Sequence, residues 1–237
     1  MKKELLEYSY ANGLSHIASS LSMIDYIDVL FTNKVVTPDD KIVIGKPFGA
    51  QAYYLVWRKL GYLDNIEQLS VGVKHDEIPF VDYGEETMGN ALGVAIGIAM
   101  STDKLVWVNI SDACLQMGNV LEAIQFIGHK RINNILLTID YNNAQVTGKT
   151  SEILSVKPII ELFKHYHWWT QEVDGHNKLA LTNTFNNIVP SAPNVVFCRT
   201  RKGHGIASIE QDIKKWHYKK IETQAELQSL VQELPAI

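Results

Sequence analysis

Residues 104–150 read KLVWVNISDACLQMGNVLEAIQFIGHKRINNILLTIDYNNAQVTGKT, and this stretch decides the fold class of the chain. It contains two largely apolar runs, at residues 105–110 and 134–140, which have the character of parallel strands buried on both faces. Between them, residues 118–127 carry apolar side chains at the spacing of an amphipathic helix. The stretch therefore predicts a βαβ unit, in which a helix joins two parallel strands.

Polar side chains follow both of these strands. Asp112 comes directly after the first, and Asn142 follows the second. Alone, Asp112 would be read as a helix N-cap and Asn142 as a turn residue. In a βαβ unit, however, both positions lie at the sheet edge where open α/β folds bind ligands. A carboxylate and an amide oxygen there suit a magnesium ion that also binds phosphate, and a diphosphate is the obvious ligand.

Length, charge and cysteine content limit the class of protein. The 237 residues suffice for one large α/β domain, and we expect residues 1–237 to form a single domain. The net charge of −4, with no face rich in lysine or arginine, argues against nucleic-acid binding. Two cysteines without a metal-binding spacing favour a cytoplasmic location. The N-terminus reads as a charged helix rather than a signal sequence, and no apolar run approaches the ~20 residues that would span a membrane.

Hydrophobic periodicity along the rest of the chain predicts an α/β fold, with a mostly parallel sheet flanked by helices. Besides the two strands above, we expect strands at residues 41–44, 167–173 and 194–200. We expect helices at residues 3–14, 23–31, 50–59, 92–100, 159–165, 180–187 and 211–234.

Five collinear segments resemble one known family. Asp112 in a turn of small residues, followed by Asn142, resembles the thiamine diphosphate motif, although Ser111 and Ala113 replace its two glycines. Four further segments resemble the N-terminal half of transketolase, in particular the short subunit found when that enzyme is split across two chains. Residues 15–25 are similar to a Gly-His-Pro-Gly segment of that family, and residues 87–93 are similar to its Gly-Ser-Leu-Gly-Gln-Gly turn. Residues 173–177 match its Asp-Gly-His turn. Residues 202–205, together with Trp216-His217, match its tail, which runs from Lys-Gly-Lys-Gly to Trp-His.

The resemblance implies a thiamine diphosphate-binding (PP-type) domain with a defined set of ligands. Mg²⁺, or Ca²⁺ or Mn²⁺ in its place, would be held by the side chains of Asp112 and Asn142 and by the backbone carbonyl of Ala144. The cofactor would also contact Ala113, Met88, Gly89 and His217.

The same resemblance implies that histidines carry the catalytic proton management. His16 and His217 would hydrogen-bond hydroxyl and carbonyl oxygens of the sugar, because imidazole exchanges protons near neutral pH. His75 would be a third such histidine, provided that three residues are deleted from its loop when the chain is aligned with the family.

Several positions near the expected cofactor depart from the family pattern. Phe48 stands where the family has a histidine, so phosphate handling or substrate choice should differ. Met117 replaces a glutamate, which puts communication between paired active sites in doubt, although Glu122 is retained. Glu85 and Glu86 would bring negative charge near the cofactor, which favours a sugar that is unphosphorylated or unusually modified.

The family's pyrimidine-binding domain has no counterpart in this sequence. The resemblance therefore implies a partner subunit similar to the C-terminal half of transketolase, an α2β2 heterotetramer, and activity only in that assembly. The expected reaction is transfer of a two-carbon ketol unit from a ketose to an aldehyde. Two alternatives stay open: a subunit of a thiamine-dependent decarboxylase or acyl-transferring synthase, and a non-catalytic assembly subunit that has kept the fold.

Overall fold

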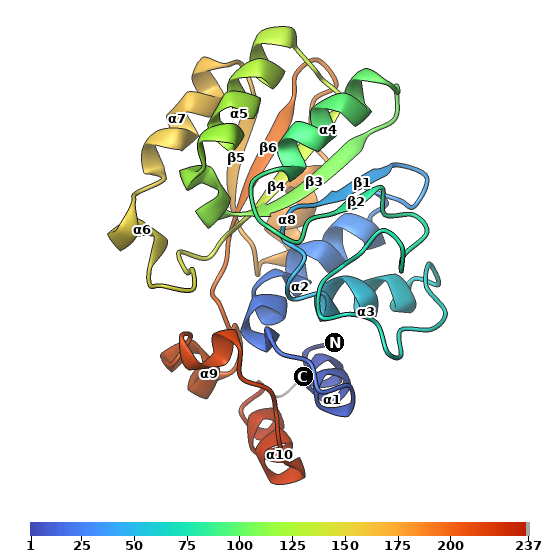
Figure 1. Cartoon of the computed structure of the whole chain (residues 1–237), viewed down its shortest axis with the longest axis vertical. Helices are drawn as coiled ribbons and strands as arrows, with labels where there is room; N and C mark the ends of the chain where they lie inside the picture. Colours follow the sequence, from blue (N-terminus) through green and yellow to red (C-terminus); the bar gives the residue numbers. More distant parts are fainter. Residues whose placement is uncertain (236–237) are drawn as a thin grey trace.

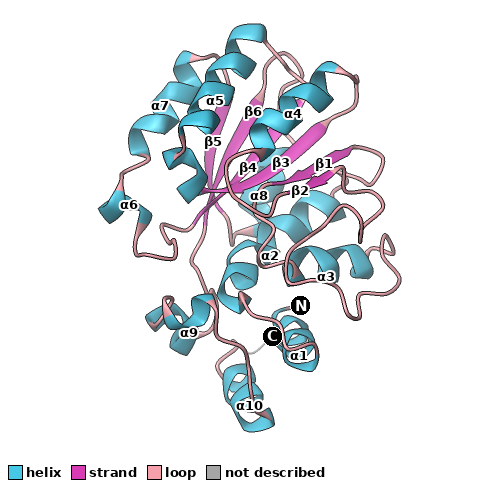
Figure 2. Ribbon diagram, in the orientation of Figure 1, coloured by secondary structure: helices cyan, strands magenta, loops and turns pink. Residues whose placement is uncertain are grey.

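A six-stranded parallel sheet organises the part of the chain that the computed structural model describes, residues 1–235 (Figure 2). The strand order is β2-β1-β3-β4-β6-β5, and every neighbouring pair is parallel. This confirms the predicted α/β fold. The strands are β1 (Lys41–Ile44), β2 (Tyr83–Gly84), β3 (Val106–Ser111), β4 (Ile135–Tyr141), β5 (Trp169–Asp174) and β6 (Asn194–Arg199).

Helices cover both faces of this sheet (Figure 1). One face carries α2 (Ile17–Thr32), α3 (Gln51–Lys59) and α8 (Lys178–Phe185), and the other carries α4 (Ala91–Met100), α5 (Gly118–Lys130) and α7 (Lys157–His165). The remaining helices are α1 (Lys2–Ala11), α6 (Thr150–Ile153), α9 (Ala207–Gln211), α10 (Gln224–Gln232) and the 3₁₀ turns η1 (Asp112–Gln116) and η2 (Lys215–His217).

Alternation along the central strands divides the core between the two faces. Trp107 of β3 packs in the cluster with α2 and α3, whereas Val106 and Val108 pack against α4 and α5. Two polar groups within this core are satisfied by each other, because the Trp107 indole donates to Thr138 Oγ1 at 3.0 Å. Each fully buried large apolar side chain contributes about 1.5–3 kcal/mol through burial. Both faces therefore hold the strands in a fixed register, with Ser111 beside Asp140.

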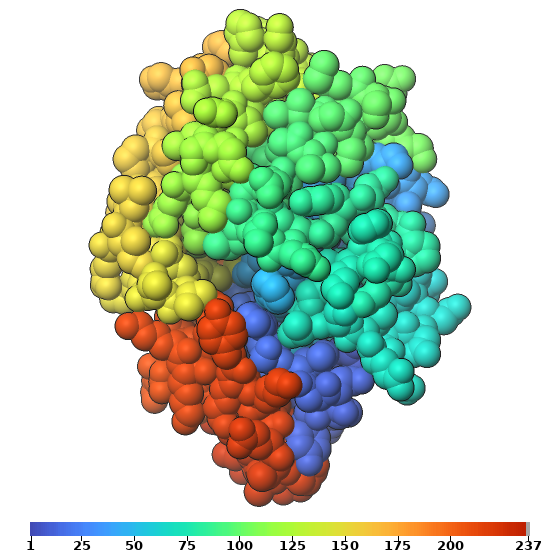
Figure 3. All heavy atoms as spheres, viewed as in Figure 1, coloured from blue at the N-terminus to red at the C-terminus, as the bar shows by residue number. Residues whose placement is uncertain are grey.

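The C-terminal segment returns to the N-terminus of the chain. Helix α10 packs against α1, and η2 lies against α2 near the carboxyl edge of the sheet (Figure 1). In the space-filling view the C-terminal segment, drawn red, meets the N-terminal helices, drawn blue (Figure 3). This return brings residues near 217 over the start of α2.

Two predicted helices are wrong in their extent. Helix α2 begins at Ile17 rather than residue 23, because the His16 carbonyl accepts the amides of Ser19 and Ser20, at 3.0 and 3.1 Å. Serines lower helix propensity, but tertiary hydrogen bonds such as Ser20 to Gln51 offset that cost. The tail is broken into α9, η2 and α10 rather than one helix over residues 211–234, and Thr223 caps α10 by accepting from the Glu226 amide.

The predicted strand at residues 167–173 begins later than expected. His167 has φ 63°, a left-handed conformation that ends α7 and cannot start a strand, so β5 begins at Trp169. The two strands and the helix of the predicted βαβ unit lie within three residues of their expected bounds. Among the described residues, none of the helices has the length and apolar character needed to cross a bilayer.

Candidate active site

A cavity of about 580 Å³ opens at the carboxyl edge of the sheet, beyond β1, β3 and β4. Of the catalytic, cofactor-binding and metal-binding residues expected from the sequence, six line it: His16, His217, Met88, Ala113, Asn142 and Ala144. Asp112 and Gly89 lie beside it without lining it, and His75 is exposed and outside it. The structure therefore gathers most of the proposed cofactor and substrate contacts around one space.

Asp112 lies at the bottom of this site, fully buried at the start of η1. Its Oδ2 accepts the Asn143 amide at 2.8 Å, which joins the turn after β4 to the turn after β3. Its Oδ1 is buried without a hydrogen-bond partner. Burial raises the pKa of Asp112 to about 6, and the Asn143 amide and the charge of Lys46 act against that rise. An unsatisfied carboxylate oxygen of this kind is an environment that a cation would complete.

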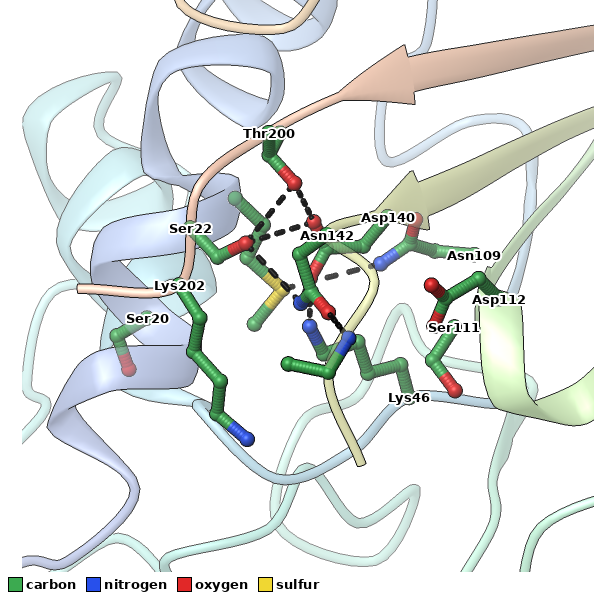
Figure 4. Close-up of polar contacts among 12 residues, drawn as sticks. Ser20, Ser22, Lys46, Asn109, Ser111, Asp112, Asp140, Asn142, Thr200 and Lys202 are labelled. Atoms are coloured by element: carbon green, nitrogen blue, oxygen red, sulfur yellow. Dashed lines mark hydrogen bonds and ion pairs between the residues drawn. The ribbon is translucent and has the colours of Figure 1, made fainter. Parts of the chain in front are cut away.

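Asn142 is held by a polar network centred on Asp140 (Figure 4). Its Nδ2 donates to Asp140 Oδ2 at 2.8 Å and to Ser22 Oγ at 3.2 Å, and its Oδ1 accepts the Ala144 amide at 2.9 Å. Asp140 also accepts from Ser22 and Thr200 and pairs with Lys46. With one lone pair used, the Asn142 oxygen keeps a second for a metal ion.

Asp140 was not among the site residues expected from the sequence, although its position at the end of β4, two residues before Asn142, was visible. Its polar partners come from α2, from the end of β1 and from the end of β6, so the need for this carboxylate appears only in three dimensions. A buried carboxylate with four donor partners is satisfied, and it fixes the elements that supply them.

Two lysines in the cavity were also absent from that expectation. Lys46 follows β1, and Lys202 follows β6; both side chains are buried and line the cavity. Burial and the charge of Lys202 lower the pKa of Lys46, whereas Asp112 raises it and contact with Asp140 favours its protonated form. Burial lowers the pKa of Lys202 to about 8, with Asp112 opposing. The Lys-Gly-His-Gly motif contains Lys202, but nothing local indicated that its ammonium would point inward.

Aromatic rings gather around the predicted catalytic histidines. His16 stacks on Phe48 with ring centroids 4.9 Å apart, and it meets the edges of His217 and Tyr218 at 5.3 and 5.2 Å. Burial, reinforced by the charges of Lys202 and Lys46, lowers the pKa of both His16 and His217 to about 4. Since Lys202 Nζ can only donate, it donates to His217 Nδ1 over 2.8 Å. Both imidazoles are therefore neutral at neutral pH.

The two glutamates expected near the cofactor have different surroundings. Glu85 is buried and accepts the Asn90 amide at the start of α4, so its charge faces that helix end rather than the cavity. Burial raises the pKa of Glu85, although hydrogen bonds from the backbone at residues 89–91 act to lower it. Of the two glutamates, Glu86 is therefore the one whose side chain lines the cavity.

Comparison with known families gives this geometry a context. A family model described as the thiamine diphosphate binding domain of transketolase matches residues 95–232. The chain is 25% identical over 240 residues to one subunit of the apulose-4-phosphate transketolase of Phocaeicola vulgatus, covering 92% of this chain and 85% of that one. It is 24% identical over 234 residues to the 6-deoxy-6-sulfo-D-fructose transketolase subunit SqwG of a Clostridium species, covering 89% and 85%.

Longer relatives match over part of their length. Mouse transketolase is 27% identical over 236 residues, which cover 90% of this chain and 38% of that protein. The crystal structure of transketolase from Campylobacter jejuni superposes with a TM-score of 0.71 and 14% identity, covering 97% of this chain and 42% of that one. The chain thus spans less than half of these full-length transketolases, and the structural likeness shows a shared fold.

Proposed function

Because this chain belongs to the transketolase family through its thiamine diphosphate-binding domain, we propose that it is the diphosphate-binding subunit of a two-chain, transketolase-like enzyme. The proposed reaction moves a two-carbon ketol unit from a ketose to an aldehyde. The transketolase names of the relatives favour this reaction over decarboxylation of a 2-oxo acid. We further propose that residues 1–237 act as one domain, and that the protein works in the cytoplasm, in keeping with its two free cysteines.

The observation that carries the proposal is the buried, unpartnered Oδ1 of Asp112 beside Asn142. These oxygens, with the Ala144 carbonyl, are the ligand set that a hard divalent cation prefers, and we propose Mg²⁺, with Ca²⁺ or Mn²⁺ as substitutes. Lys46 and Lys202 would balance the negative charge of a diphosphate in the same cavity. When bound, thiamine diphosphate supplies the electron sink for cleavage of the carbon–carbon bond.

The chain's own residues would orient the sugar and manage its protons. His16 and His217 are neutral, so each offers one N–H donor and one acceptor nitrogen. The Nδ1 of His16 lies 2.9 Å from the Ser15 hydroxyl, and the Nδ1 of His217 is used by Lys202. The Nε2 of each ring therefore remains for sugar hydroxyl or carbonyl groups. His75, exposed outside the cavity, would need a loop movement to take part.

We propose a partner subunit that completes this cavity and carries the pyrimidine-binding domain, in an α2β2 assembly. Support comes from the two relatives that are named as transketolase subunits, together with the rim of the cavity. Four of its lining side chains are large, apolar and exposed: Phe48, Met88, Val146 and Tyr218. An apolar rim around a polar floor suits contact with another protein better than contact with a sugar.

The test is calorimetric titration of thiamine diphosphate, with and without Mg²⁺, into this chain mixed with a candidate partner resembling the C-terminal half of transketolase. We expect binding that requires Mg²⁺ and is lost in Asp112→Asn, whereas the exposed Glu161→Gln variant on α7 binds as the wild type does. Failure of the wild-type mixture to bind would contradict the proposal. Release of CO₂ from a 2-oxo acid, without ketol transfer, would replace it with the decarboxylase alternative.

A further inference from the structure

A chain of hydrogen bonds outside the cavity runs from α2 to the segment that carries Lys202. Asp25 Oδ2 lies 2.9 Å from His176 Nδ1, and His176 Nε2 accepts the backbone amide of Arg201, also at 2.9 Å. An amide can only donate, so Nε2 carries no proton. The neutral His176 ring therefore bears its proton on Nδ1 and donates it to Asp25. The partners on both sides thus assign a single tautomer.

Arg201 belongs to a short segment, residues 200–203, that several hydrogen bonds tie to its surroundings. On one side, Thr200 Oγ1 donates to Asp140; on the other, the Gly203 amide donates to the Ala18 carbonyl at 2.9 Å. Between them, the Lys202 side chain turns inward to the cavity and is 6% exposed. The bonds from Arg201 to His176 and from Gly203 to Ala18 therefore tie the backbone on the two sides of Lys202.

Asp25 is suited to hold the proton of His176 because it stays ionised. Burial by itself would raise the pKa of Asp25, but the hydrogen bond from His176 and the charge of Lys2, whose Nζ lies 3.1 Å away, outweigh burial and lower it. An anion facing Nδ1 favours the proton on that nitrogen. The ring of His204 stacks on that of His176, with centroids 3.5 Å apart, and limits rotation of the His176 imidazole.

These same three side chains resemble a metal site, since ligand atoms of Asp25, His176 and His204 lie within 4.8 Å of one another. The hydrogen bonds argue against that assignment. A metal ion on Nδ1 of His176 would move the proton to Nε2, where it would oppose the Arg201 amide. The Nδ1 of His204 already accepts from the Arg201 guanidinium at 2.8 Å, because a guanidinium can only donate.

We propose that Asp25 and His176 are a positioning pair, which holds the Arg201 amide and thereby keeps the Lys202 ammonium inside the cavity. The pair acts through the backbone and touches neither substrate nor cofactor. Only the use of Lys202 toward a diphosphate rests on the proposed function. The placement of Lys202 is a property of this chain alone, and it can be measured without any cofactor or partner.

The first measurement is ¹⁵N NMR of the full chain with labelled histidine, which reports which ring nitrogen of His176 is protonated. We expect Nδ1–H in the wild type and in Lys2→Met, a control that removes the ion pair but leaves the acceptor. In Asp25→Asn the side-chain amide of the new asparagine can donate to Nδ1 of His176. We therefore expect some of the protein to carry the His176 proton on Nε2 instead. A wild-type ring protonated on Nε2 would overturn the proposal.

The second measurement is competitive acetylation of lysines, read by mass spectrometry, on variants whose melting curves show that they are folded. We expect Lys202 to become roughly tenfold more reactive in Asp25→Asn and His176→Phe, the change expected when one hydrogen bond is lost. The exposed Lys178 serves as the internal reference. His176→Gln, whose amide oxygen can accept from Arg201, should keep Lys202 protected.

Unchanged reactivity of Lys202 in both Asp25→Asn and His176→Phe would overturn the proposal. So would binding of Zn²⁺ to the wild type that both His176→Phe and His204→Ala abolish, because the cluster would then be a metal site. If Lys202 becomes reactive as expected, but the wild-type mixture binds no thiamine diphosphate, the positioning pair stands and the proposed function fails.

Discussion

The ring of Phe48 stacks on the imidazole of His16, with centroids 4.9 Å apart and an interplanar angle of 22°. The resemblance seen in the sequence predicts a histidine at this position, and the structure has an apolar ring there that covers His16. The cover contributes to the burial that keeps His16 neutral.

Replacing Phe48 with alanine should raise the pKa of His16 from about 4 toward its ordinary value of 6.5, since burial is the largest cause of its lowering. The rise means that His16 binds its proton at a higher pH. NMR titration of the imidazole measures this directly. Phe126→Ala is the matched control, because Phe126 on α5 is exposed to a similar degree, 40% against 39%, and lies outside the cavity. An unchanged His16 pKa would show that Phe48 does not desolvate it.

Asp112 should make the metal-free protein less stable as the pH rises. Its pKa is raised from 3.8 to about 6 in the folded chain, so the folded state binds more protons than the unfolded state between these values. The free energy of unfolding should fall over that interval, by up to about 3 kcal/mol, and stay lower above it. Urea denaturation as a function of pH checks this. Asp112→Asn should remove the decline, and a decline that persists in this variant would assign it to other groups.

Breaking the buried pair between Lys46 and Asp140 should be costly. Lys46→Met leaves a fully buried carboxylate without its cation, and we expect a loss of about 3–5 kcal/mol in the free energy of unfolding. Adding Asp140→Asn should recover part of that loss, and a double-mutant cycle in urea measures the coupling. The control pair is Lys41 and Asp82, which is partly exposed, and Lys41→Met should cost less than about 1 kcal/mol. Equal costs for the two lysines would contradict the assignment.

Gly89 should not tolerate alanine. Its φ is 117°, and a Cβ there would lie 2.8 Å from Met117 Sδ. We expect Gly89→Ala to destabilise the protein by about 1–3 kcal/mol. Gly93→Ala is the control, since Gly93 lies in α4 with open space around its Cβ position, and it should be neutral or stabilising by up to about 1 kcal/mol. Thermal unfolding of both variants tests the contrast, and equal melting temperatures would contradict it.

Local sequence signals predicted the fold more completely than the site. Strands and helices with continuous apolar character, such as β3, β4 and α5, could be located within a few residues. The C-terminal tail could not, because its helical periodicity is interrupted by the burial of Trp216 and Ile221 against the rest of the molecule. In the site, Asp112 and Asn142 were proposed from their spacing, and the structure places Asn142 in the wall of the cavity and Asp112 beside it. His75 was not brought to the cavity, since its assignment depended on a loop alignment rather than on a strand end.

The sequence by itself determined the parallel α/β architecture and the sheet edge where Asp112 and Asn142 meet, because strand periodicity and a short βαβ connection leave few ways to arrange those residues. Only the tertiary structure decided which other groups enter the site. Lys46 follows β1, Asp140 lies near the end of β4 and Lys202 follows β6. His176 reaches Arg201 across 25 residues of chain. Their charges and protonation states depend on burial and on partners distant in sequence, and these arise only once the chain is folded.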